Sequence, residues 1–155
     1  MRTAEELRYL ILAIQREGNR RLAAEFRPLG VTPSQAEVLR VLSDSGPLTL
    51  VGLGELLVCE STTSPSRLVD RMASQGLVQR EASSSDRRFV TLTLTPEGRR
   101  VAQQIVAVEN QLYEELDRLT AGRPVEQALT VLHALADGTP AGEALDRRRR
   151  AGAAS

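Results

Sequence analysis

Apolar residues recur at helical spacing along most of the chain and alternate over only one short stretch. Near the N-terminus they fall at i, i+3, i+4 and i+7, which predicts an amphipathic helix over about residues 3–27. The apolar stripe of this helix consists of Leu7, Leu10, Ile11 and Ile14. Thr3 and Glu6 have the spacing of a capping box at its start, and Pro28 disfavours helical geometry at its end. A helix of this length in so small a chain predicts a second surface that covers it.

Two further helices are predicted to begin at Thr-Pro pairs, Thr32-Pro33 and Thr95-Pro96. Threonine is a favoured N-cap, and proline at the first helical position loses no hydrogen bond. The first helix is expected to end at the polar stretch 43–47, and the second to run to about residue 119. Apolar positions in the second follow a spacing close to that of a coiled-coil seam. They are Val101, Ile105, Val108, Leu112, Leu116 and Leu119.

The middle of the chain combines two short helices with a β-hairpin. A short helix capped by Thr49 precedes a hydroxyl-rich turn at 59–65, and a second helix is predicted from about residue 62 to 75. Residues 77–80 and 89–94 fit short strands, with a polar loop at 82–88 between them. Two short helices around a turn, followed by a hairpin, form a winged helix-turn-helix. The predicted fold is therefore mainly α with a small β-hairpin wing.

The second helix of a helix-turn-helix enters the major groove of DNA. Hydroxyls can bond to bases or phosphates, and arginine can bind guanine O6 and N7 at two points. Arg87 and Arg88 in the hairpin loop could reach an adjacent minor groove, while Asp86 is expected to position one of these arginines. The candidate DNA-contacting residues are Ser61, Thr62, Thr63, Ser64, Ser66, Arg67, Arg71, Asp86, Arg87 and Arg88.

Composition argues against most other classes of function. The single cysteine, Cys59, cannot form an internal disulfide, and the single histidine, His133, leaves too few ligands for a metal cluster. No apolar run reaches the roughly 18 residues of a membrane span, and the N-terminus lacks a secretory segment. We therefore expect a cytoplasmic protein that uses neither a metal nor another cofactor. The net charge is zero, yet residues 61–100 carry a charge of +3 between acidic flanks, which favours binding of an anion at the centre.

Five motifs together resemble the MarR family of bacterial transcription regulators. They are TPSQAEVL at 32–39, residues 61–72 with the ending SRLVDRM, GLV at 76–78, DRR at 86–88 and LTLTPEG at 92–98. The resemblance covers about residues 5–136. It implies a homodimer in which the first and last helices form the interface, and in many members a small aromatic or lipophilic effector that releases the DNA. It also assigns base reading to the helix from about Thr62 to Gln75, and the wing positions to Asp86 and Arg88.

The resemblance and the pattern together predict one domain over residues 1–136. Its winged helix-turn-helix spans about 32–98, and its dimerisation helices span about 3–27 and 96–136. Residues 137–155, rich in Gly, Pro, Ala and Arg, are expected to form a disordered tail. The candidate dimer-interface residues are Leu7, Leu10, Ile11, Ile14, Leu112, Leu116, Leu119, Leu129 and Leu132.

The expected function is that of a sequence-specific regulator bound to double-stranded DNA, most simply a repressor relieved by a ligand. A two-fold dimer predicts a near-palindromic operator. An enzyme is disfavoured because the chain carries neither a catalytic motif nor a glycine-rich phosphate loop. Two alternatives stay open: a winged-helix module that binds protein instead of DNA, and a regulator that senses oxidants through Cys59. The run Arg147–Arg150 is either a solvated tail or a source of non-specific DNA affinity.

Overall fold

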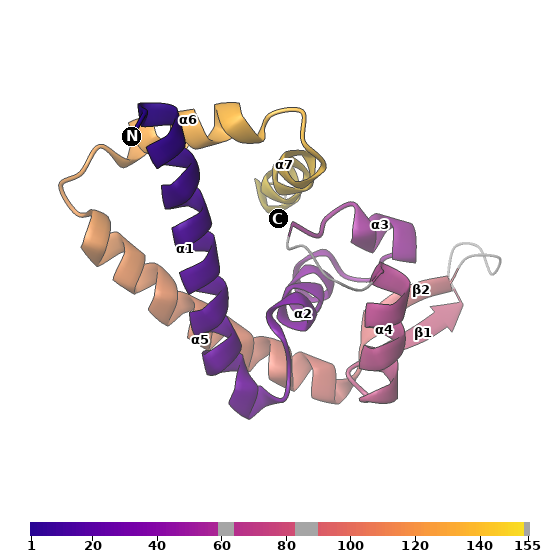
Figure 1. Ribbon diagram of the computed structural model, residues 1–155. Helices are drawn as coiled ribbons and strands as arrows, with labels where there is room; N and C mark the ends of the chain where they lie inside the picture. The colour runs from indigo at the N-terminus through magenta and orange to yellow at the C-terminus, as the bar shows by residue number, and fades with distance from the viewer. Residues whose placement is uncertain (59–63, 83–89, 154–155) are drawn as a thin grey trace.

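The computed structural model describes residues 1–58, 64–82 and 90–153. Its elements, labelled in Figure 1, are α1 (Thr3–Phe26), the 3-10 turn η1 (Arg27–Leu29), α2 (Pro33–Ser45), α3 (Leu50–Gly54), α4 (Pro65–Ser74), β1 (Val78–Ala82), β2 (Val90–Leu94), α5 (Pro96–Thr120), α6 (Val125–Ala136) and α7 (Pro140–Ala153). The predicted fold class, helices with one small hairpin, is confirmed.

One hydrophobic core joins the short central helices to the hairpin and to the beginning of α5. Its largest fully buried side chains are Phe26, Leu39, Leu53, Met72, Leu92, Ile105, Val38 and Val69. The far half of α5 leaves this core, crosses α1 and then diverges from it, as Figure 1 shows. The core therefore holds α2, α3, α4 and the hairpin as one block, from which the long helices project.

Most of the predicted helix starts are correct. Thr32 forms a full capping box with Gln35: its hydroxyl accepts from the Gln35 N–H at 3.3 Å, and its own N–H donates to the Gln35 side chain at 2.9 Å. Thr49 and Thr95 cap α3 and α5 in the same way, through the N–H groups of the residues three positions on. The capping box predicted at Thr3 is wrong, because Thr3 is already helical and Arg2 occupies the cap position with no side-chain bond.

The hairpin is antiparallel, with Val78 opposite Leu94 and Ala82 opposite Val90. The first strand is longer than predicted, since it reaches Ala82 instead of Arg80. Leu48, just before α3, adds an isolated bridge to Leu92, with N···O distances of 3.2 and 2.7 Å. This bridge fixes the hairpin to the start of the helix-turn-helix.

Close backbone packing explains why a glycine, Gly98, follows the LTLTPE stretch. A Cβ at this position would lie 1.9 Å from the Leu77 carbonyl oxygen, so the backbone approach requires the absence of a side chain. The Thr95 hydroxyl donates to the Gly76 carbonyl at 2.6 Å, and the Thr95 N–H donates to the Leu77 carbonyl at 3.1 Å. The first turn of α5 is thereby fixed against the link between α4 and β1.

The prediction of disorder from residue 137 onward is wrong for Pro140–Ala153, which form the helix α7. The Thr139 hydroxyl accepts from the Gly142 N–H at 3.1 Å, and Pro140 follows this cap. Alanine and arginine are strong helix formers, and Glu143 and Arg147 pair at i, i+4 spacing. Ala144 is only 2% exposed, so the helix also packs against the rest of the chain.

Among the described residues, no helix is both long enough and apolar enough to cross a membrane.

Candidate nucleic-acid interface

The helix α4 presents one apolar face and one polar face. Leu68, Val69 and Met72 are buried against α3 and β1. Ser64 is the N-cap, where its hydroxyl accepts from the Arg67 N–H at 3.4 Å, and Pro65 follows at the first helical position. On the opposite, exposed face lie Ser64, Ser66, Arg67, Asp70 and Arg71. Hydroxyls and guanidinium groups on one exposed helix face are suited to bonding with base edges and phosphates.

The arginines of this face are not neutralised by the neighbouring acid. Asp70 instead accepts a hydrogen bond from Arg80 on β1, at 2.5 Å. Within the described ranges, no salt bridge joins Arg67 or Arg71 to a carboxylate. Their positive charge is therefore displayed on the polar face of α4.

Arg80 is a residue that sequence reasoning missed. Its contact with Asp70 joins α4 to the first strand of the hairpin, ten positions along the chain. A second link comes from Gln35, whose amide donates to the Gln75 side chain at 2.8 Å and so connects the start of α2 to the end of α4. Neither pair has a sequence spacing that marks it, because both depend on how separate elements pack.

Several predicted site residues lie outside the part of the chain that the structure describes. They are Ser61, Thr62, Thr63, Asp86, Arg87 and Arg88, together with Cys59. The described strands β1 and β2 pair as far as Ala82 and Val90.

The predicted interface leucines and isoleucines remain accessible in the single chain. Leu7 and Leu112 are half-buried, and the others are exposed: Leu10, Ile11, Ile14, Leu116, Leu119, Leu129 and Leu132. The seam along α5 divides into two halves. Val101 and Ile105 are buried in the core, whereas Leu116 and Leu119 have 48% and 60% of their surface exposed. No residue of α6 is buried, although this helix is largely apolar.

A group of charged residues connects α2 with α5. The Arg40 guanidinium contacts Glu109 at 3.1 Å and Asp44 at 3.3 Å. Burial raises the pKa of Glu109, and Arg40 opposes part of that rise. Burial also raises the pKa of Tyr113, and the neighbouring Glu109 charge acts in the same direction. This group holds the central block against the long helix α5.

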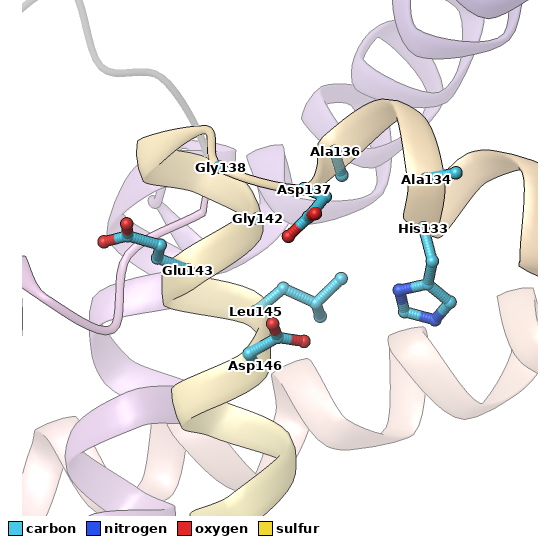
Figure 2. Close-up of a pocket in the computed structure, with 9 residues that line it drawn as sticks. All are labelled: His133, Ala134, Ala136, Asp137, Gly138, Gly142, Glu143, Leu145 and Asp146. Carbon is cyan, nitrogen blue, oxygen red and sulfur yellow. The ribbon is translucent and has the colours of Figure 1, made fainter.

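An open pocket of about 310 Å³ lies between α6 and α7, as Figure 2 shows. Its lining includes His133, Asp137, Leu145 and Asp146. Across residues 1–58, 64–82 and 90–153, no three side chains of His, Cys, Asp or Glu come together as metal ligands would. The pocket therefore has mixed polar and apolar walls.

Comparison with known proteins places this arrangement in a family. A family model described as "MarR family" matches residues 29–88. An HTH-type transcriptional regulator of Bacillus subtilis, YsmB, is 31% identical over 117 residues, which cover 72% of this chain and 73% of that protein. The multiple antibiotic resistance protein MarR of Salmonella typhimurium is 31% identical over 114 residues, covering 72% and 78% of the two chains.

The similarity extends to solved structures. A mutant of Escherichia coli MarR complexed with operator DNA superposes with a TM-score of 0.68 at 26% identity, over 87% of this chain and 94% of that one. Sequence identity across most of both chains and the shared winged-helix architecture lead to one conclusion. The chain belongs to the MarR family of transcriptional regulators.

Proposed function

We propose that this protein is a homodimeric repressor that binds a near-palindromic double-stranded operator. The observation that carries the proposal is the polar face of α4, where Ser64, Ser66, Arg67 and Arg71 are exposed together above a buried apolar face. A helix of this kind is suited to lie in the major groove with its arginines against base edges. The similar E. coli MarR mutant was solved with operator DNA, which supports the same mode of binding here.

The dimer follows from the apolar residues that the single chain leaves exposed. Leu10 and Ile14 lie on α1, Leu116 lies on α5 and Leu132 lies on α6, all outside the central block. Large contiguous apolar surfaces are uncommon on monomers, and a second copy of the same helices would cover them. A two-fold dimer would present two α4 helices to successive turns of one face of the DNA, so the operator would contain two inverted half-sites.

The regulatory part of the proposal is that a small lipophilic or aromatic effector relieves repression. The protein acts on DNA in the cytoplasm and has no catalytic role. This part of the proposal rests on the resemblance to the family. An effector must bind the DNA-free form more tightly than the DNA-bound form in order to release the operator.

Selection of bound fragments from the source genome tests this proposal. The purified protein should enrich a small set of fragments with a shared inverted repeat, and binding should weaken steeply as salt rises. Repeating the selection with a panel of lipophilic and aromatic compounds should identify the effector through loss of binding. Enrichment of no sequence above bulk DNA would contradict the proposal and favour the protein-binding alternative.

A further inference from the structure

The C-terminal helix α7 packs against the helix-turn-helix, not only against α6. Figure 1 shows α7 beside α3, on the side away from the β1–β2 hairpin. Pro140, Ala141 and Ala144 of α7 share a groove with Val51, Gly54, Leu57 and Val58 from the α3 region. Of these α7 residues, Ala144 is buried. A small side chain there permits the two helices to approach.

Two consecutive arginines of α7 contact α2 and the segment that leaves α3. We call residues 55–58 the pre-turn segment, because they follow α3 and precede the turn that the sequence predicts at 59–65. Arg147 donates to the Glu55 carbonyl at 3.2 Å. Arg148 donates to the Glu37 carboxylate at 2.9 Å, and the same oxygen accepts from the Val58 N–H at 2.8 Å. Arg147 therefore contacts the pre-turn segment directly at Glu55, and Arg148 reaches it at Val58 through the Glu37 carboxylate.

Glu37 makes this arrangement energetically significant. It lies on α2 and is only 8% exposed, so its charge depends on bonds made within the protein. Arg148 supplies a cation and the Val58 N–H supplies a second donor. The pre-turn segment has no regular secondary structure at Leu57 and Val58, and its backbone position depends on such tertiary bonds.

We infer that Arg147 and Arg148 are positioning residues for operator recognition, acting through the pre-turn segment on the placement of α4. This inference rests on the proposed DNA-binding role of α4. It assigns to α7 a task other than contact with DNA, since the arginines are directed at α2 and α3. Loosening the pre-turn segment would lower the fraction of molecules in which α4 is correctly placed. The apparent operator affinity would fall in proportion to that fraction.

The test compares four single substitutions in the full-length protein: Arg147→Ala, Arg148→Ala, Arg148→Lys and, as the matched control, Arg150→Ala. Arg150→Ala removes the same charge from an exposed position of the same helix. We expect Arg147→Ala and Arg148→Ala each to weaken operator binding about fivefold while leaving affinity for unrelated DNA and its salt dependence unchanged. Arg148→Lys should recover most of the loss, and Arg150→Ala should behave as wild type.

Hydrogen exchange of the Val58 amide gives an independent readout. It should accelerate in Arg148→Ala and stay at the wild-type rate in Arg150→Ala. Equal losses for Arg148→Ala and Arg150→Ala on both DNAs, with a flatter salt dependence, would show that α7 contacts phosphates directly and would overturn the inference. Unchanged operator binding in Arg147→Ala and Arg148→Ala would also overturn it. Failure of the wild type to bind any operator would instead count against the proposed function, and Val58 exchange would still report whether α7 holds the pre-turn segment.

Discussion

The Asp70 carboxylate on α4 and the Arg80 guanidinium on β1 are 2.5 Å apart, and their bond joins α4 to the β1–β2 hairpin. Both side chains are about half exposed, so water and salt screen the pair. A double-mutant cycle with Asp70→Asn and Arg80→Gln should give a coupling below about 1 kcal/mol in the free energy of unfolding, measured in urea. Raising the salt concentration should reduce the coupling further. A coupling of several kcal/mol would contradict the conclusion that solvent screening makes this pair weak.

Gly98 should be intolerant of any side chain. Gly98→Ala would place a Cβ 1.9 Å from the Leu77 carbonyl oxygen, where backbone must move. We expect a loss of about 1–3 kcal/mol in the free energy of unfolding, as for other overpacked sites. Gly18→Ala is the matched control, because α1 has open space at that position and alanine is the better helix former. The control should be neutral or slightly more stable, and equal losses in both variants would contradict the close approach.

The exposed half of the α5 seam should mediate dimerisation. Placing charges there with Leu112→Glu and Leu116→Glu would bury unpaired carboxylates in the proposed interface, at a high cost in association free energy. Sedimentation should show a dimer for the wild type at micromolar concentration and a monomer for the double variant. Val90→Glu, at an exposed apolar position on the wing, should remain dimeric. A monomeric wild type, or an unchanged double variant, would remove the basis for the dimer.

Glu109 predicts a pH dependence of stability with a defined sign. Burial raises the pKa of Glu109 in the folded state above 4.5. The ionised form of Glu109 is therefore less stable in the native protein than in the unfolded chain. The contribution of Glu109 to the free energy of unfolding is therefore present at low pH. It is lost as pH rises from about 4.5 through the folded pKa. Compared with Glu109→Gln, the wild type should lose unfolding free energy over that interval.

Glu115 provides the comparison of opposite sign. Its hydrogen bond with Arg21 lowers the pKa of the Glu115 carboxyl, so the contribution is present above pH 4.5 and is lost as pH falls through the folded pKa. Urea unfolding of Glu109→Gln and Glu115→Gln across pH 3 to 8 should give differences from wild type that slope in opposite directions. Slopes of the same sign would show that the two carboxyls do not have the environments described.

The helix starts that sequence reasoning predicted and the one that it missed share the same local chemistry. Thr32-Pro33 and Thr95-Pro96 were predictable because cap, proline and the following apolar spacing all agreed. Thr139-Pro140 has the same start, yet the following residues are rich in Gly, Ala and Arg and lack an apolar stripe. That composition by itself predicts a disordered tail. The helix is instead stabilised by its cap, by residue propensity and by contacts to α2 and α3 that lie about a hundred positions away in sequence.

The same limit applies to the candidate interface. The exposure of Ser64, Arg67 and Arg71 follows from helical periodicity, because their spacing opposes that of Leu68, Val69 and Met72. The partners of Asp70 and Glu37 could not be predicted, since Arg80 and Arg148 reach them only after separate elements have packed. Local rules therefore identified the polar face, and tertiary packing determined how it is held.

The most direct test of the central claim is the position-specific effect of Arg67→Ala on operator binding. If α4 reads bases, the variant should lose discrimination at particular positions of each half-site, by about 1–3 kcal/mol where the contact is bidentate. Arg87→Ala, predicted from the sequence to act on the backbone or minor groove, should weaken all operator variants more evenly and flatten the dependence of log affinity on log salt. Arg123→Ala, at the turn after α5, should leave binding unchanged. The measurement is binding across a library of single-base operator variants at several salt concentrations. A pattern of position-specific loss in Arg67→Ala alone supports the account, whereas identical profiles for Arg67→Ala and wild type would contradict the assignment of α4 as the base-reading helix.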